Sequence, residues 1–346
     1  MFVCKFGGTA LSDAQNVKKV IKIIKSDKAR RFVVVSAMGK AYVKDRKVTD
    51  VLCDCFFELN ETGSMKSWDF VANKYLSLAE KLDAPVDMRA LLKNVREQIL
   101  ASPYRDFVVS RGEYLSAKLL SAALGFRYIE AAEVVRFFPD GALNLAESER
   151  LLAESAKNCS KGCVMGGFYG SDGMRTVTFP RGGSDISGAV AAAALNAEIY
   201  ENWTDVDGFF SADPALVTGA RPIAALSPEQ AEKICRAGVG VLHWACIAPA
   251  AQAGIPVFVK NTFRPEAPGT RIARDADYSG ICVALSREQS GLVRATLMGA
   301  APEKQAEARL ALPEKLPRAC RDGALQVLCP PAQARQVAQI LHDAGS

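Results

Sequence analysis

Histidine and closely paired cysteines are scarce in this chain of 346 residues. His243 and His342 are the only histidines, and none of the ten cysteines forms a C-x-x-C pair. Zinc sites are built mostly from cysteine and histidine at such spacings. We therefore expect no zinc centre, and free thiols in a reducing cytoplasm.

Long apolar runs and strong net charge are also lacking. No apolar stretch approaches the ~20 residues that a helix needs to cross a bilayer, and the N-terminal MFVCKF is typical of a strand rather than of a secretory signal. The formal charge is only +5, and its densest basic run (17–25) has the spacing of a solvated helix face. We expect a cytoplasmic protein that binds neither membrane nor nucleic acid.

Short apolar segments alternate with helical patterns through about residue 272. The expected strands, after the N-terminal one, are 32–36, 127–131, 163–168, 198–203 and 255–260. Capping boxes are predicted at 12–15 and 227–230, and helix-ending glycines at Gly238 and Gly254. The alternation predicts an α/β fold, a three-layer αβα sandwich with a mostly parallel central sheet.

A boundary is expected at 264–272, which contains two prolines and a glycine. Beyond it, strand patterns at 281–287, 292–299 and 324–329 precede a helical pattern at 332–345. We therefore expect two domains, 1–272 and 273–346, the second a small α+β unit.

The first candidate site is the glycine-rich turn from Lys5 to Thr9, which follows the N-terminal strand. Its paired glycines allow backbone N–H groups to approach an anion, and Lys5 adds a full charge. A tight strand-to-helix turn with an exposed lysine explains the same residues equally well.

The second is the turn from Arg181 to Asp185, which places two glycines and a hydroxyl before an alanine-rich helix. Arginine is suited to bidentate recognition of carboxylate or phosphate. Alternatively, Ser184 or Asp185 simply caps the helix. A second anion-ready turn in one chain favours phosphate chemistry.

The third is the turn at 203–208, WTDVDG, where two aspartates could hold a metal-bound nucleotide or a ribose. Aspartate is also an ordinary turn residue. Among single residues, Glu113 ends an S-x-x-E pattern that could be a capping box, and Lys260 closes a strand at the same expected sheet edge. His243 is better explained as a packed residue than as a base.

Together and in this order, these motifs resemble those of aspartate kinases in the amino-acid-kinase family. The matching pieces are KFGGT (5–9), VVSAMGK (34–40), KVTD (47–50), RGEYLSA (111–117), GGFYGSDG (166–173), RGGSD (181–185), NWTDVDGFFSADP (202–214), VLH (241–243) and VKNTFRPEAPGT (259–270). The resemblance spans residues 1–272, and the spacing of KVTD is most similar to that in clostridial and related bacteria.

The resemblance implies the amino-acid-kinase fold and transfer of the ATP γ-phosphoryl group, with Mg²⁺, to the β-carboxylate of L-aspartate. The product, 4-phospho-L-aspartate, begins the route to lysine, threonine and methionine. The resemblance implies that Lys5 and Asp185 are the catalytic residues, which act at the transferring phosphoryl group. It assigns aspartate to Ser36, Thr49, Glu113, Arg181 and Ser184. It assigns the nucleotide to Gly7, Gly8, Thr9, Thr204, Asp205, Phe210 and Lys260, and the metal ligands stay unassigned.

The chemistry of the reaction agrees with this composition. A carboxylate acceptor is already ionised at neutral pH, so no general base is required. Catalysis then needs cations, backbone amides and Mg²⁺ to bring two anions together, and the scarcity of histidine is no obstacle.

Some positions depart from the family pattern. Ala10, Phe210 and Ala215 replace a usual serine, tyrosine and arginine, mainly on the nucleotide side, and Trp244 is also unusual.

Aspartate kinases usually end in two ACT modules that bind end-product amino acids and help form dimers. Residues 273–346 can supply only one, which lacks an evident glycine-rich effector loop. We expect a homodimer with weak or absent inhibition by lysine or threonine.

Two other interpretations stay open. One is a kinase for another amino-acid carboxylate, such as glutamate or N-acetylglutamate, and the RGEYLSA and KVTD motifs argue against it. The other is a non-catalytic amino-acid sensor or regulatory subunit derived from a kinase. Retention of Lys5, Arg181, Asp185 and Lys260 argues against a sensor, which has no need of phosphate-binding cations.

Overall fold

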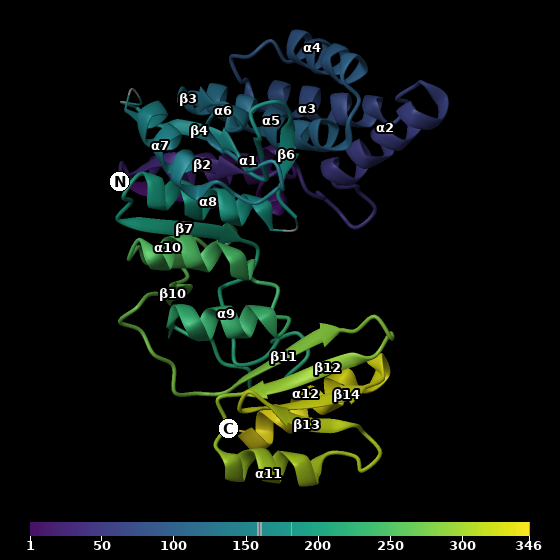
Figure 1. The fold of residues 1–346 in the computed structure, drawn as a ribbon, viewed down its shortest axis with the longest axis vertical. Coiled ribbons are helices and arrows are strands. Elements are labelled where there is room, and N and C mark those ends of the chain that lie inside the picture. Colours follow the sequence, from purple (N-terminus) through teal and green to yellow (C-terminus); the bar gives the residue numbers. More distant parts are fainter. Residues whose placement is uncertain (158, 160, 181, 346) are drawn as a thin grey trace.

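The computed structural model describes residues 1–157, 159, 161–180 and 182–345. Its larger part, in the upper part of Figure 1, is built around an eight-stranded sheet. The strand order is β3-β4-β2-β1-β7-β9-β10-β8. The bounds are β1 Phe2–Phe6, β2 Arg30–Val35, β3 Arg127–Ile129, β4 Cys163–Gly166, β7 Ile199–Thr204, β8 Ala225–Leu226, β9 Val257–Asn261 and β10 Thr270–Ile272. All neighbouring strands are parallel except β9 and β10. The mostly parallel sheet is therefore confirmed.

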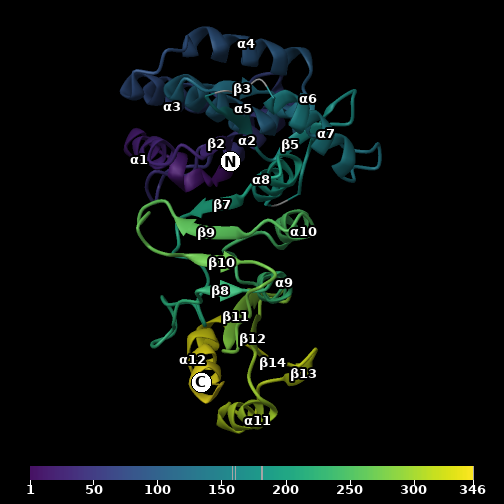
Figure 2. The same cartoon turned by 90° about the vertical axis from the view of Figure 1, so that its left-hand side faces the viewer.

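Helices cover both faces of this sheet. They are α1 Ala14–Lys25, α2 Val48–Thr62, α3 Trp68–Leu82, α4 Met88–Ala101, α5 Arg105–Leu124, α6 Ala131–Val134, α7 Leu145–Ala156, α8 Gly183–Ala194, α9 Pro228–Arg236 and α10 Ile247–Gln252, with 3₁₀ turns η1 Gly8–Leu11 and η2 Trp244–Cys246. Figure 2 shows α1 on one side of the sheet and α8 and α10 on the other.

Alternation along the strands explains the three layers. Val3 and Val34 belong to the core shared with α7, α8 and α10, whereas Cys4 and Val33 belong to the core shared with α1 to α5. Successive side chains of a strand point to opposite faces, so apolar residues at every position require cover on both sides. The αβα sandwich follows from these buried runs.

Helix boundaries agree with the sequence in part. Ser227 and Gln230 form the predicted capping box of α9, and Gly238 and Gly254 have positive φ just beyond α9 and α10. The capping box predicted at 12–15 is wrong, because Asp13 is the N-cap of α1 and accepts from the backbone N–H of Asn16.

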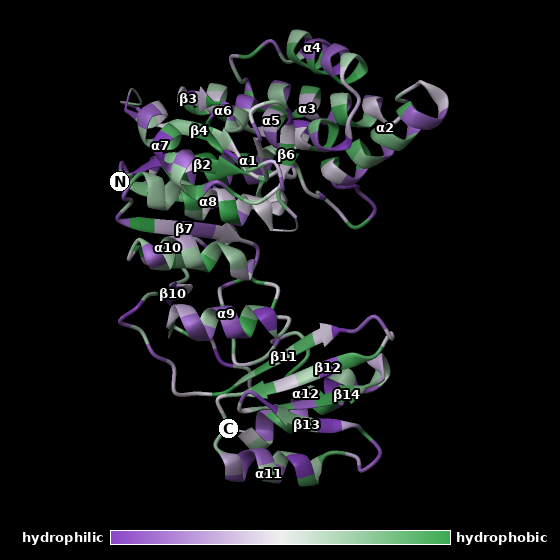
Figure 3. Ribbon diagram, viewed as in Figure 1, coloured by the Kyte–Doolittle hydropathy of each residue, from purple (hydrophilic) through white to green (hydrophobic). Residues whose placement is uncertain are grey.

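A smaller antiparallel sheet follows Ile272, in the order β11-β12-β14-β13. Its elements are β11 Cys282–Arg287, β12 Val293–Met298, α11 Pro302–Ala311, β13 Arg318–Arg321, β14 Ala324–Cys329, η3 Pro331–Gln333 and α12 Ala334–Gly345. The three expected strands and the final helix are present, while α11 and β13 were not expected. Figure 3 shows α11 and β13 to be largely hydrophilic, and only Ala308 of α11 is buried.

Two further findings differ from the sequence expectations. A hairpin of β5 Tyr169–Ser171 and β6 Thr176–Thr178 was not predicted. Cys159 and Cys163 form a disulfide, so the expectation of free thiols is wrong for this pair. Among the residues described, no helix has the length and apolar character needed to cross a membrane.

Candidate active site

The predicted site residues that the structure describes gather at the carboxyl ends of the parallel strands, where open α/β sheets bind ligands. Lys5 lies near the end of β1 and pairs with Val34 of β2 and Asn202 of β7. Thr204 ends β7, and Lys260 of β9 pairs with Trp203. This register places the ends of four neighbouring strands at one edge.

Lys5 and Asp185 form an ion pair at the centre of this edge. The distance between Lys5 Nζ and Asp185 Oδ1 is 2.6 Å, and the two side chains are only 10% and 14% exposed. Asp185 also accepts from Asn202 Nδ2 at 2.9 Å and from the backbone N–H of His243 at 3.1 Å. The alternative of an exposed Lys5 is therefore wrong.

The electrostatics of Asp185 follow from these partners. Burial acts to raise the pKa of its carboxyl, but Lys5, Asn202 and the His243 N–H together hold that pKa below its usual value. The carboxylate therefore stays ionised and holds the Lys5 ammonium at the sheet edge.

The first glycine turn is shaped by a close backbone crossing. The N–H of Gly39, in the loop after β2, donates to Gly8 O at 2.8 Å. A Cβ on Gly8 would lie 2.8 Å from Ala37 O, and one on Gly39 would lie 2.6 Å from the carbonyl carbon of Gly8. Both positions need glycine because a side chain does not fit between these two backbone segments.

The N–H groups of this turn differ in their availability. The Gly7 N–H already donates to Trp203 O at 3.1 Å. The residues described offer no backbone acceptor to the N–H groups of Gly8 and Thr9. These two amides, beside the Lys5 ammonium, are the better candidates to bind an anion.

The second turn leads into α8. Gly182 is the N-cap with φ +77°, so neither Ser184 nor Asp185 caps the helix and the capping alternative is wrong. A Cβ on Gly182 would lie 2.2 Å from His243 Cγ. The helix N-terminus thus presents uncapped N–H groups beside the buried Ser184, an arrangement that favours anions. Arg181 lies outside the described residues.

Glu113 lies in the middle of α5, so the capping-box alternative is wrong for it too. Its side chain is buried, and its Oε2 has no hydrogen-bond partner among the described residues. Burial raises the pKa of this carboxyl to about 8, although the backbone N–H of Ala37 and the charge of Arg111 act to lower it. A buried carboxyl with a vacant acceptor is suited to a cationic ligand.

The remaining aspartate-side residues lie around Glu113. A Cβ on the adjacent Gly112 would lie 2.7 Å from Ala37 Cβ and 3.2 Å from Val48 Cγ1. Ser36 precedes Ala37, and Thr49 follows Val48 in the first turn of α2. The close packing at Gly112 therefore brings the loop after β2, the start of α2 and the middle of α5 together.

The third turn borders a cavity of about 720 Å³. Thr204, Asp205 and Phe210 line it, together with Val283 and Leu285 of β11. Asp205 connects two of the turns, because it accepts from Thr9 Oγ1 at 3.2 Å and from Thr204 Oγ1 at 3.3 Å. The cavity is large enough for a nucleotide base and ribose.

Lys260 and Asp207 lie beside this cavity in different roles. Lys260 Nζ lies 5.4 Å from the centre of the Trp203 ring, a cation–π contact that holds it at the sheet edge. Asp207 accepts from Asn261 Nδ2 at 2.8 Å and pairs with Arg264. Asp207 therefore ties its turn to β9 and the residues after it through side-chain contacts, whereas the turn interpretation expected a bond to its own backbone.

Several contributors were not identified from sequence. Asn202 and the His243 backbone hold Asp185, and Gly39 closes the first turn. Asn202, His243 and Gly39 all lie within matched motifs, which was the available signal. No sequence motif pointed to Val283 and Leu285, because both lie in the C-terminal unit, outside the matched motifs.

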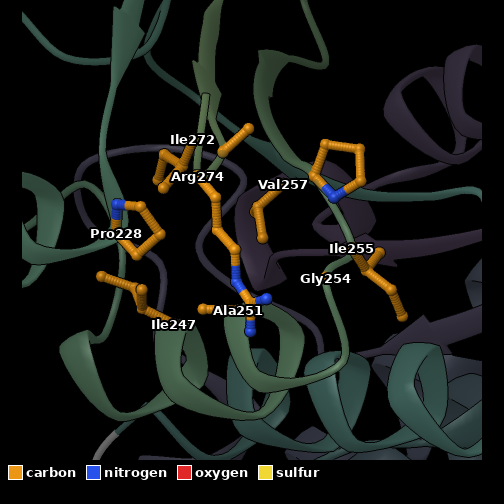
Figure 4. Close-up of a pocket in the computed structure, with 10 residues that line it drawn as sticks. Pro228, Ile247, Ala251, Gly254, Ile255, Val257, Ile272 and Arg274 are labelled. Atoms are coloured by element: carbon orange, nitrogen blue, oxygen red, sulfur yellow. The ribbon is translucent and has the colours of Figure 1, made fainter. Parts of the chain in front are cut away.

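A second cavity lies away from this edge, between α10 and strands β9 and β10 (Figure 4). It measures about 10 Å³ and is lined mainly by apolar residues such as Ile247, Val257 and Ile272. This volume is about that of a single water probe, so we assign it no ligand.

Comparison with known proteins identifies the fold and family. Residues 1–261 match the amino acid kinase family. The chain belongs to this family. This amino acid kinase is 35% identical to aspartokinase 3 of Bacillus subtilis, over 80% of its own length and 64% of that relative. It spans only 33% and 55% of two plant relatives, a bifunctional aspartokinase/homoserine dehydrogenase and an aspartokinase of Arabidopsis thaliana.

Solved structures agree with this assignment. Clostridium acetobutylicum aspartate kinase superposes with a TM-score of 0.85 at 26% identity, covering 100% of this chain and 99% of that chain. E. coli aspartokinase III, solved with aspartate and ADP, also gives 0.85, at 24% identity and 99% coverage of both chains. The expected amino-acid-kinase fold is confirmed.

Proposed function

We propose that the protein is an aspartate kinase, which transfers the ATP γ-phosphoryl group to the β-carboxylate of L-aspartate and releases 4-phospho-L-aspartate. The observation that carries the proposal is the buried Lys5–Asp185 pair, set between two glycine turns at the carboxyl edge of the sheet. The aspartokinases among its relatives support aspartate as the acceptor.

Lys5 would lie against the transferring phosphoryl group, where its ammonium offsets the negative charge of two approaching anions. Asp185 would hold Lys5 in place and organise the magnesium-bound phosphates. Gly8 and Thr9 would contribute amide N–H groups to the phosphates, with Gly7 leaving room for them. No protein base is needed, because the acceptor carboxylate is ionised.

On the aspartate side, the ionised form of Glu113 would accept the substrate ammonium. Arg181 would bind a substrate carboxylate, and Ser36, Thr49 and Ser184 would donate hydrogen bonds. The convergence of α2, α5 and the loop after β2 at Gly112 supports the grouping of Ser36, Thr49 and Glu113.

On the nucleotide side, the cavity of about 720 Å³ would take the base and ribose, lined by Thr204, Asp205 and Phe210. Lys260 would neutralise phosphate charge from the neighbouring strand. Phe210 and Ala215, which depart from the usual tyrosine and arginine, both line this cavity, so they act on ATP affinity more than on aspartate recognition.

The donor set fits Mg²⁺ that arrives with ATP. Among the described residues, no group of three or more acidic, cysteine or histidine side chains could hold a metal ion by itself. Magnesium in kinases is held largely by substrate phosphates, water and one or two carboxylates. Asp185 is the buried carboxylate available at the phosphates, and bound Mg²⁺ would supply charge neutralisation there.

We further propose that residues 1–272 are the catalytic domain and residues 273–346 a reduced ACT-like domain. The four-stranded sheet with α11 and α12 on this segment supports the second assignment. The whole protein would be a cytoplasmic homodimer with no membrane or nucleic-acid partner. Its product, 4-phospho-L-aspartate, would enter the route to lysine, threonine and methionine.

The proposal is tested with an acceptor panel. The protein is incubated with Mg·ATP, hydroxylamine and L-aspartate, L-glutamate or N-acetyl-L-glutamate, and the acyl phosphate is trapped as its hydroxamate. We expect product with aspartate alone. Product with another acceptor would assign a different carboxylate kinase. Aspartate binding in a calorimeter with neither ATP binding nor turnover would instead identify a sensor.

A further inference from the structure

The loop at residues 39–47, between β2 and α2, is pinned at both ends and exposed at its tip. It begins at Gly39, which crosses the first glycine turn, and closes where the N–H of Val48 donates to Met38 O at 3.0 Å. Between these points Tyr42 and Val43 are 68% and 94% exposed. Something other than apolar burial must hold this loop.

That role falls to Lys74 of α3. Its Nζ donates to Gly39 O at 2.8 Å, to Asp45 Oδ2 at 2.7 Å and to Arg46 O at 3.2 Å. An ammonium has three N–H groups, so all of its donors are used. The Lys74 side chain is only 12% exposed, which makes these bonds costly to lose.

Asp45 completes the clamp from within the loop. Its Oδ2 also accepts from the backbone N–H of Ala41 at 2.7 Å, and its Oδ1 accepts from that of Arg46 at 2.8 Å. Burial acts to raise the pKa of Asp45, but these N–H groups and Lys74 lower it, so the carboxylate is ionised. One ion pair thus joins the beginning and end of the loop to α3.

The two ends of the loop lead directly to the candidate site. Gly39 holds the crossing with Gly8, and Arg46 lies three residues before Thr49 in the first turn of α2. Displacement of either end by about 1 Å can cost up to ~100-fold in rate when substrate-binding groups move with it. Lys74 itself lies on a helix outside the predicted site motifs.

We propose that Lys74 is a positioning residue for aspartate, which acts through Asp45 and the loop at 39–47 to hold Ser36 and Thr49 in place. The inference rests on the proposed function. It predicts that loss of the clamp impairs use of aspartate more than affinity for ATP. The cavity for the base and ribose is built from other segments, and the loop meets the nucleotide side only at the crossing of Gly39 with Gly8.

The test compares Lys74→Met, Asp45→Ala, the double variant and the control Lys81→Met, whose lysine is exposed on the same helix. We expect Lys74→Met to lower kcat/KM for aspartate by about 10- to 100-fold, with affinity for Mg·ATP changed by less than about threefold. The double variant should lose no more than the worse single one, because both substitutions break the same clamp. Lys74→Arg should recover part of the loss.

Limited trypsin digestion gives a readout that needs no turnover. Lys40, Lys44, Arg46 and Lys47 are exposed cleavage sites within the loop. The loop should be cut several-fold faster in Lys74→Met than in the unmodified or Lys81→Met protein. Unchanged cutting, or faster cutting with unchanged aspartate kinetics, would overturn the proposal, as would equal losses of aspartate and ATP affinity. If the unmodified protein does not use aspartate, the proposed function fails, while the digestion rates still decide whether the clamp exists.

Discussion

At the scale of single residues, the candidate site depends on charges that are buried in different ways. Asp185 is surrounded by a cation and two N–H donors, so its burial is compensated. Glu113 is more deeply buried, at 4% exposed, but its Oε2 has no partner among the described residues. Ionisation of such a carboxyl is costly in the free protein, and a cationic substrate group at the vacant Oε2 would offset that cost.

If Glu113 binds the substrate ammonium as proposed, its raised pKa predicts that aspartate binding depends on pH. With a pKa of about 8, Glu113 is mostly protonated at neutral pH in the free protein and must lose a proton to accept the ammonium. The KM for aspartate should therefore fall up to about tenfold per unit as the pH rises towards 8, and level off above it. In Glu113→Gln, KM should be independent of pH and close to that of the protonated protein, so it exceeds the KM of the unmodified protein most above pH 8.

The raised pKa of Glu113 also predicts that the ligand-free protein becomes less stable as the pH rises, whereas aspartate binding becomes tighter. Because the folded-state pKa lies above the ordinary 4.5, ionisation of Glu113 destabilises the fold, by an amount that grows from pH 4.5 to about 8 and then stays constant. Glu113→Gln should raise the melting temperature of the ligand-free protein above pH 8 and leave it unchanged below pH 4.5. The exposed Glu97→Gln is the control, and a gain of the same size at every pH would contradict the assignment.

At the scale of elements, the start of α8 is the most constrained turn of the site. Gly182 and Gly125 both have positive φ, +77° and +68°, but only Gly182 lies against another residue. Alanine costs about 1–2 kcal/mol at either position through its backbone conformation. Gly182→Ala adds the collision with His243, whose N–H holds Asp185.

We therefore expect the free energy of unfolding of Gly182→Ala to be at least about 2 kcal/mol lower than that of Gly125→Ala. A difference of this size is typical of overpacked sites. It should also lose most kinase activity, while Gly125→Ala keeps it. Chemical denaturation and the hydroxamate assay measure the two effects. Equal destabilisation of the two variants would show that the contact with His243 is not limiting.

The elements also show what the sequence could and could not predict. Buried β-branched runs and cap residues predicted the six principal strands of the large sheet and the capping box at Ser227, because these signals are local. The capping box at 12–15 failed because Asp13 competed with the neighbouring Ser12 for the same N-cap. The S-x-x-E pattern at Glu113 is mid-helix, where periodicity outweighs a four-residue motif.

Within the site, motifs identified the residues but not their partners. Lys5 and Asp185 are 180 positions apart, and no local pattern reveals that they meet at 2.6 Å. The Gly8–Gly39 crossing and the Lys74 clamp are likewise tertiary contacts. Contacts of this kind depend on the order of strands in the sheet, which periodicity does not determine.

At the scale of the whole molecule, the proposed nucleotide cavity is lined by both parts of the chain. The N–H of Val283 donates to Ser211 O at 2.7 Å, and Ser211 Oγ lies 2.9 Å from His342 Nε2 of α12. Ala212 and Val217 belong to the core of the C-terminal unit. Changes in that unit can therefore reach Phe210, which precedes Ser211 and lines the cavity.

A second interface cavity, of about 430 Å³, lies beside the connection from β12 to α11. Arg221, Lys304 and His342 contribute to its lining, and no acidic side chain is present among the described residues that line it. A cationic lysine ligand is disfavoured in such surroundings. We expect the aspartate saturation curve to be unchanged by millimolar lysine, and a substantial rightward shift would contradict this.

The most direct test of the central claim is aspartate-dependent hydroxamate formation by the whole chain. Unmodified protein, Lys5→Ala and the control Lys18→Ala, whose lysine is exposed on α1, are assayed with Mg·ATP, aspartate and hydroxylamine, after melting curves confirm that each is folded. The account predicts hydroxamate with the unmodified and control proteins, and at least ~100-fold less with Lys5→Ala, as for loss of a charge-stabilising donor. ADP release without hydroxamate, or hydroxamate undiminished in Lys5→Ala, would contradict it.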